Sequence, residues 1–198
     1  MAKKKIGLIV NPIAGMGGSV GLKGTDGKMY QKAVDLGADP ITPQRTADFL
    51  SQLSEKSQLE FFAAPGKMGA DYLETSGVPH QVVGQTNQQT TAADTRRIAK
   101  LMMESAVDLL VFVGGDGTAR DIVDAVKTEL PVVAVPAGVK MYSAAFAVNP
   151  QAAAQMVEAY LEGTNLVEEE VLDIDEAAYR EDRLASQLYG YLTVPQVQ

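Results

Sequence analysis

Short, mostly apolar runs alternate along this sequence with longer segments that have helical periodicity. The apolar runs predict five buried strands, at residues 5–10, 59–64, 80–83, 108–113 and 131–136. Between them, apolar residues recur at the three- and four-residue spacing of amphipathic helices. Buried strands separated by helices form a mostly parallel sheet covered on both faces, with right-handed crossovers. The predicted fold is therefore α/β, a Rossmann-like doubly wound sheet with helices on both faces.

Polar residues mark the ends of several predicted helices. Thr42 before Pro43 predicts an N-cap followed by proline in the first turn, and Thr91 with Asp94 forms a variant of the capping box. Asn149 before a proline predicts the start of another helix, which Gly163 ends.

The composition excludes several classes of protein. The 198 residues contain no cysteine, which rules out disulfides and thiolate metal sites and indicates a reducing, cytoplasmic setting. No run reaches the ~20 apolar residues that a membrane helix needs. The net charge is −8, and segment 168–183 carries eight acidic residues against two arginines. Without a basic stripe we expect no nucleic-acid partner, and we interpret the acidic segment as a solvated face or linker.

The pattern changes after Gly163. The stretches "VEEEVLDI" and "LYGYLTVPQV" predict two further strands separated by an acidic piece. No strand follows the last one to pair with it, which predicts either a docking arm or the opening of a β-rich second domain. We therefore divide the chain into an α/β domain, 1–165, and an acidic linker with strands, 166–198, that begins a truncated β-rich domain. An open strand edge also makes a homo-oligomer an expectation.

Half of the eighteen glycines lie in two loops, 15–27 and 114–117, each of which follows a predicted strand. Ligands of doubly wound sheets bind at the carboxyl ends of strands, and glycine lets the backbone approach a phosphate closely. Tight turns are the alternative. The common phosphate motifs do not fit, because no lysine follows Gly117 and the dinucleotide fingerprint fails at Val20 and Arg120. Hydride-transfer enzymes are thereby disfavoured.

Asp116 lies between the glycines of the second loop. A carboxylate repels phosphate, so a loop that only binds phosphate should exclude it. It is tolerated where it binds a cation or accepts a proton from an attacking hydroxyl. The alternative is that Asp116 merely caps a helix that begins near Thr118. His80, the only histidine, has no metal-ligand pattern around it and is interpreted as a surface or packing residue.

The stretches "GGDGT" at 114–118 and "NPIAG" at 11–15 resemble the NAD kinase and diacylglycerol kinase superfamily. A fuller pattern also includes "TTAADTRRIA", "GGDGTARDI", "PAGVKMYSAAFAVNP" and "LYGYLTVP". It resembles the predicted ATP-NAD kinases related to acetoin-catabolism protein X. Proteins of this kind continue into a β-rich domain, so the resemblance implies that the 198-residue chain alone has little or no kinase activity.

The resemblance implies a role for each residue of the two loops. Asp116 would be the catalytic base, and ATP and Mg²⁺ would be required. Gly138 and Lys140 occupy the region where well-studied NAD kinases carry an asparagine–acidic pair, and Lys140 would contact phosphate. Asp26 is a weak candidate metal ligand and otherwise a turn residue. The remaining nucleotide- or phosphate-binding candidates are Asn11, Gly15, Gly17, Gly18, Gly114, Gly115, Gly117 and Thr118.

These inferences predict an ATP-dependent small-molecule kinase that phosphorylates a hydroxyl of NAD or a related acceptor, with polyphosphate as an alternative donor. A non-catalytic nucleotide-binding or sensing module linked to acetoin catabolism is the second hypothesis. A lipid kinase of the diacylglycerol type is the third, and no basic amphipathic stretch supports it.

Overall fold

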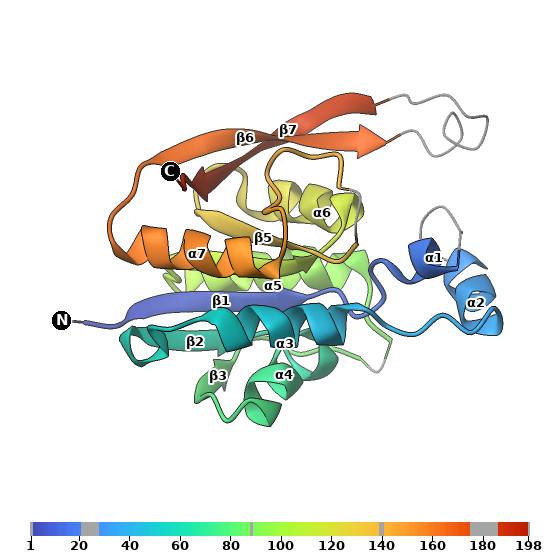
Figure 1. Ribbon diagram of the computed structural model, residues 1–198, viewed down its shortest axis with the longest axis horizontal. Helices are drawn as coiled ribbons and strands as arrows, with labels where there is room; N and C mark the ends of the chain where they lie inside the picture. Colours follow the sequence, from blue (N-terminus) through green and yellow to red (C-terminus); the bar gives the residue numbers. More distant parts are fainter. Residues whose placement is uncertain (1, 21–27, 88, 139–140, 175–185, 198) are drawn as a thin grey trace.

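A parallel sheet of five strands forms the centre of the molecule (Figure 1). The computed structural model describes residues 2–20, 28–87, 89–138, 141–174 and 186–197. The strands are β1 (Lys4–Val10), β2 (Leu59–Ala63), β3 (His80–Val82), β4 (Leu109–Gly114) and β5 (Val132–Pro136). Each predicted strand is present to within one residue at either end. All neighbours are parallel, in the order β3-β2-β1-β4-β5, which confirms the predicted Rossmann-like fold.

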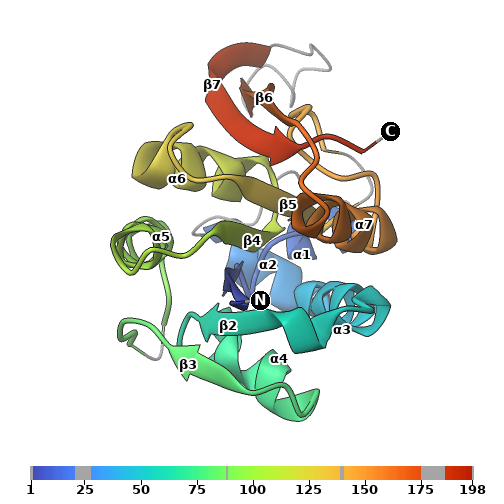
Figure 2. The ribbon, with the colours of Figure 1, turned by 90° about the vertical axis from the view of Figure 1, so that its left-hand side faces the viewer.

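Helices cover both faces of this sheet (Figure 2). On one face lie α3 (Thr42–Gln52) and α7 (Pro150–Leu161), and on the other lie α5 (Ala92–Glu104) and α6 (Asp116–Val126). This double cover explains why all six residues of β4 are buried, because apolar side chains face a helix layer on either side. The shorter elements are α1 (Met16–Ser19), α2 (Lys28–Asp35), η1 (Lys56–Gln58), η2 (Gly66–Met68) and α4 (Ala70–Thr75).

The predicted helix ends are mostly confirmed. The capping box of Thr91 and Asp94 opens α5, and the Asn149 side chain accepts a hydrogen bond from Ala152 N at the start of α7. Gly163, at a φ of +83°, follows the end of α7. The prediction for Thr42 is wrong by one position, since Ile41 is the N-cap of α3. The buried Thr42 hydroxyl instead donates to Pro12 O, 3.3 Å away, which joins α3 to the loop after β1.

A β-hairpin follows the parallel sheet. Its strands, β6 (Leu166–Ile174) and β7 (Ser186–Pro195), pair antiparallel, so the prediction of a last strand without a partner is corrected: β6, which precedes it, is the partner. Val171, Leu192 and Val194 are buried in the same apolar core as the parallel sheet. The hairpin lies over α6, α7 and β5 (Figures 1 and 2). The boundary at 165/166 stays a prediction, and the acidic piece between the strands lies largely outside the described residues.

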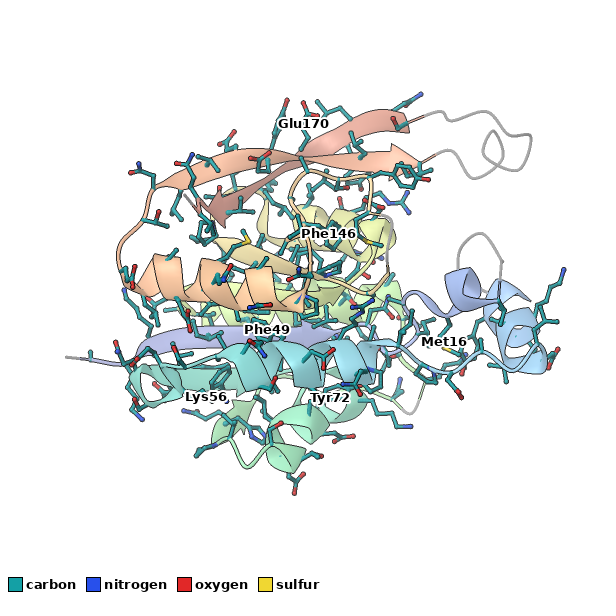
Figure 3. All side chains as sticks on the ribbon, viewed as in Figure 1. Met16, Phe49, Lys56, Tyr72, Phe146 and Glu170 are labelled. Atoms are coloured by element: carbon teal, nitrogen blue, oxygen red, sulfur yellow. The ribbon has the colours of Figure 1, made fainter. Side chains whose placement is uncertain are left out.

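Segment 143–147 joins the edge of the sheet to the hairpin. Ala147 N donates to Ala134 O of β5 (3.0 Å), and Ala145 N donates to Glu170 O of β6 (3.3 Å). Phe146, labelled in Figure 3, belongs to this segment. Its ring packs edge-on against Phe112 of β4, with 5.7 Å between the ring centroids. This segment therefore connects β4 and β5 of the sheet to β6. None of the helices in the described part of the chain is long and apolar enough to cross a membrane.

Candidate functional site

The segments that follow β1 and β4, which carry the described parts of the two glycine-rich loops, start side by side at the carboxyl edge of the sheet. β1 and β4 are parallel neighbours, and Asn11 N donates to Val113 O at 2.9 Å where both strands end. From β1 the sheet proceeds to β2 and β3 in one direction, and from β4 to β5 in the other. The loops therefore follow the two strands at which the strand order reverses. In doubly wound sheets this switch point is the usual place for a ligand.

Asn11 fixes the two loops to each other. Its Nδ2 donates to Thr118 Oγ1 of α6 at 3.0 Å, and its Oδ1 accepts from Ile13 N at 3.2 Å. Thr118 is buried and Asn11 is half-buried. Both ends of the asparagine amide are thus used within the protein, and its evident role in this structure is to shape the loop after β1.

Two of the glycines are required by the packing of the protein itself. Gly15 has a φ of +78°, and a Cβ there would lie 2.5 Å from Ala137 O. A Cβ on Gly114 would lie 2.4 Å from Thr118 Oγ1, because the first turn of α6 folds back over the end of β4. At these two positions glycine is explained without a ligand.

Gly115 and Gly117 differ from that pair. A Cβ on Gly115 would meet nothing within 4 Å, and one on Gly117 would meet only the Arg120 guanidinium, at 3.6 Å. Neither residue has a positive φ. Neither packing nor backbone conformation requires glycine here, and the missing side chains leave main chain bare beside Asp116. Bare main chain at a helix start is what close approach by a phosphate needs.

The other predicted nucleotide-binding residues are only partly placed. Gly17 is buried in α1, and Gly18 lies in the same short helix. Gly138 follows Ala137, whose N–H donates to Gly114 O at 2.9 Å, so the loop after β5 joins the other two. Lys140 and Asp26 lie outside the described residues. The structure therefore brings three loops together at one edge, after β1, β4 and β5.

Asp116 is the first residue of α6, and its carboxylate is turned toward the chain after β5. Oδ1 accepts hydrogen bonds from Ser143 N (2.9 Å) and Ser143 Oγ (2.5 Å), and Oδ2 accepts one from Tyr142 N (3.1 Å). Gly115 is the N-cap of α6, and no side chain caps this helix. The alternative that Asp116 serves as the helix cap is thus wrong, because its oxygens bind another loop.

These bonds leave part of the carboxylate available. An ionised carboxylate accepts about four hydrogen bonds, two on each oxygen. Among the described residues, donors fill both positions on Oδ1 and one on Oδ2. The first turn of a helix also favours a negative charge. With respect to the residues that the structure describes, Asp116 is therefore an oriented carboxylate with one acceptor position left on Oδ2.

Reasoning from the sequence missed Ser143 as part of this arrangement. Its side chain is 4% exposed, and besides donating to Asp116 its Oγ accepts from Leu172 N of β6 at 2.9 Å. Ser143 lies within the stretch "PAGVKMYSAAFAVNP", but no local spacing distinguishes it from the other small residues there. Ser143 follows Asp116 by 27 positions in the sequence. That separation indicates a contact only when the fold is already known.

The remaining charged side chains of α6 are bound within the protein. Arg120 forms an ion pair with Asp173 of β6, and Arg96 of α5 contacts Asp121 at 2.5 Å. Burial raises the pKa of Asp121, although Arg96 opposes the shift. In the described ranges no three His, Asp or Glu side chains form a group that could hold a metal ion.

An apolar groove of about 520 Å³ lies elsewhere, between α7, residues 144–148 and the hairpin. Phe146, Met156 and Val194 are among the residues that line it. None of the predicted site residues does, so this groove is separate from the loops around Asp116.

A family model described as the ATP-NAD kinase N-terminal domain matches residues 6–165. The matched stretch begins in β1, ends directly before β6 and includes both glycine-rich loops. No curated protein matches the chain.

Proposed function

The chain belongs to the ATP-NAD kinase N-terminal domain family, and from that premise we propose that it binds a nucleotide and serves in phosphoryl transfer from ATP to a hydroxyl of NAD or a related acceptor. Membership supports an NAD-kinase-like phosphotransferase in general. The choice of acceptor, the use of ATP rather than polyphosphate and the role of each residue are parts of the proposal.

One observation carries it: an oriented carboxylate lies beside two glycines that the protein's own packing does not require. Bare main chain at Gly115 and Gly117 suits a phosphate, whereas a carboxylate at the same place repels one. Both features are accommodated when a phosphorylated donor lies over the glycines and a neutral hydroxyl approaches Asp116. That pairing is the ground state of a phosphoryl transfer.

In the proposed reaction the two oxygens of Asp116 have separate tasks. Oδ1 is held by Ser143 and keeps the carboxylate in place. Oδ2 accepts the proton of the acceptor hydroxyl while the hydroxyl oxygen forms its bond to the terminal phosphorus of the donor, and the bond from that phosphorus to the leaving phosphate oxygen breaks. Asn11 and Thr118 keep the loops after β1 and β4 aligned during this step.

A magnesium ion fits this proposal as a companion of the triphosphate. Proteins usually hold Mg²⁺ through one or two carboxylates together with substrate phosphates, so a group of three protein ligands is not needed. When bound, the ion would neutralise phosphate charge. Asp26 remains a weak candidate for a protein ligand, and it lies outside the described residues.

A nucleotide-sensing module without turnover, with its suggested link to acetoin catabolism, is the second candidate. It is favoured by the three hydrogen bonds that already bind Asp116, because a carboxylate used only for structure would be satisfied in the same way. The two candidates differ in what Asp116 does for the substrate.

A transfer assay distinguishes these candidates. A longer form of the chain, one that carries the expected β-rich domain, is incubated with ATP, or with polyphosphate, and Mg²⁺, because the 198-residue chain alone is expected to transfer little or no phosphate. The acceptors tested are NAD, simple sugars and diacylglycerol. We expect phosphate to appear on NAD or a related dinucleotide. Binding of ATP and NAD measured by calorimetry, with no transfer to any acceptor under any condition, would favour the sensing module. Transfer to diacylglycerol alone would contradict the proposed acceptor.

A further inference from the structure

β6 is bonded along both of its edges. One edge pairs with β7, and on the other edge Glu170 O accepts from Ala145 N while Leu172 N donates to Ser143 Oγ. Figure 3 shows Glu170 at the outer strand layer, above the segment that carries Phe146. The hairpin is thus bonded directly to the short segment that holds Asp116.

The Ser143 hydroxyl lies at the centre of this connection. A serine hydroxyl has one hydrogen to donate and two lone pairs to accept with. Because Leu172 N–H occupies a lone pair, the hydroxyl hydrogen is directed at Asp116 Oδ1, 2.5 Å from Oγ. The side chain is 4% exposed, so water does not compete freely for either bond.

We propose that Ser143 is a positioning residue: it fixes the rotation of the Asp116 carboxylate so that Oδ2 faces the acceptor hydroxyl, and β6 in turn fixes Ser143. This inference rests on the proposed function of Asp116. The terminal torsion of an aspartate is broad and roughly two-fold, so the side chain alone does not define which oxygen points where. The hydrogen bonds from Ser143 N and Ser143 Oγ to Oδ1 select one of these two orientations.

The kinetic test compares Ser143→Ala with Ser54→Ala in a preparation that turns over. Ser54 is a matched control, because its hydroxyl also donates to a carboxylate, Glu158 Oε1 at 2.6 Å, on the far side of the fold. We expect Ser143→Ala to lower kcat about tenfold to a hundredfold with little change in nucleotide KM. Ser143→Thr, which retains the hydroxyl, should recover most of the loss, and Ser54→Ala should match the wild type.

A double-mutant cycle shows whether Ser143 acts through Asp116. In an Asp116→Asn background the further change Ser143→Ala should lower kcat no more than about twofold, since the group it positions is already gone. Equal losses in both backgrounds would overturn the inference, and so would a Ser143→Ala enzyme with wild-type kcat. If Asp116→Asn itself retains more than about a tenth of kcat, the proposed function fails instead.

A second measurement on the 198-residue chain needs no turnover. Amide hydrogen exchange of Tyr142 reports whether Asp116 Oδ2 still accepts its bond, and exchange of Leu172 reports the loss of the Ser143 acceptor. In Ser143→Ala we expect both amides to exchange at least about tenfold faster, and in Ser54→Ala neither to change. Faster exchange at Leu172 alone would mean that Ser143 only anchors β6, which overturns the positioning role.

Discussion

The two ends of helix α6 contact the rest of the chain in different ways. In its first turn, Asp116 and Thr118 form hydrogen bonds with Tyr142, Ser143 and Asn11, which belong to the loops after β5 and β1. These bonds are directional and depend on where individual atoms lie.

Further along, the helix and the turn after it contact β7 through close packing as well as hydrogen bonds, and none of these contacts involves Asp116. A Cβ on Gly190 would lie 2.8 Å from Val123 Cγ1, so the strand and the helix approach as nearly as glycine allows. The Tyr189 hydroxyl donates to Asp124 at 2.7 Å, and Thr193 Oγ1 donates to Thr128 O at 3.0 Å. We expect changes in the first turn to alter catalysis more than stability, and changes at the β7 contact to do the reverse.

The largest effect is expected for Asp116→Asn. The amide cannot take a proton from the acceptor hydroxyl, so kcat should fall about 10²–10⁴-fold. It also cannot accept every bond that the carboxylate accepts, which should lower the free energy of unfolding by about 1 kcal/mol. Steady-state kinetics and urea unfolding measure these two quantities. A variant that retains more than about a tenth of kcat would show that Asp116 is not the base.

At the other end of α6, Gly190→Ala should lower the free energy of unfolding by about 1–3 kcal/mol, because the new methyl group overlaps Val123. Assayed well below its melting temperature, the variant should keep kcat within about threefold of the wild type. Val123→Ala in the same chain removes the overlapping methyl group and should restore part of the stability. A kcat that falls together with stability would show that the two ends of the helix are not independent.

A smaller effect within the first turn is expected when the bond between Asn11 and Thr118 is removed. Thr118→Val keeps the shape of the side chain and should cost about 1 kcal/mol of unfolding free energy. Asn11→Ala should cost somewhat more, because Ile13 N also loses its acceptor. Chemical unfolding of both single variants and the double variant gives the coupling. Strictly additive losses would contradict a direct bond between these side chains.

The smallest expected effect concerns Asp94 at the start of α5, outside both regions. Burial raises the pKa of its carboxyl, but hydrogen bonds from Arg97 and Thr91 outweigh burial, and the pKa lies below its ordinary value of 3.8. The ionised group therefore contributes stability above that value and loses it as the pH falls through the lowered pKa. Asp94→Asn should reduce stability at neutral pH, and the difference from the wild type should vanish in acid. Melting temperatures across this pH range provide the measurement.

The framework of the molecule was predictable because local patterns define it. Four of the five strands, β1, β2, β4 and β5, are mostly apolar, and polar or turn residues adjacent in sequence limit them. The short β3, His80–Val82, is the exception. That the loops after β1 and β4 share an edge also followed, since parallel strands end on the same side. Asp116 was identifiable from the sequence because a carboxylate repels phosphate, so its presence in a glycine-rich loop indicates a separate role.

The contacts of Asp116 were not predictable, because they depend on how a distant segment returns along the edge of β5. Residues 143–147 have small or apolar side chains apart from Ser143, and nothing local indicates that this segment lies between β5 and β6. The Thr42 prediction failed for a related reason. The Thr42 hydroxyl donates to Pro12 O, 30 positions away in sequence, and does not cap the helix. Thr42 is instead the first residue of α3, and Ile41 is the N-cap, one position before the predicted one.

The position of β1 in the middle of the sheet has a consequence for the order of folding during synthesis. Lys5 N bonds to Asp108 Oδ2, 103 positions later in the chain, and the ladder between β1 and β4 has the same long separation. β1 can pair with β2 while the chain is still emerging from the ribosome, but its other edge must wait until β4 has been made. Contacts so far apart in sequence form slowly, and an open edge in the meantime invites association with other chains. The loop after β1 is therefore among the first parts of the site to be synthesised and among the last to find its partners.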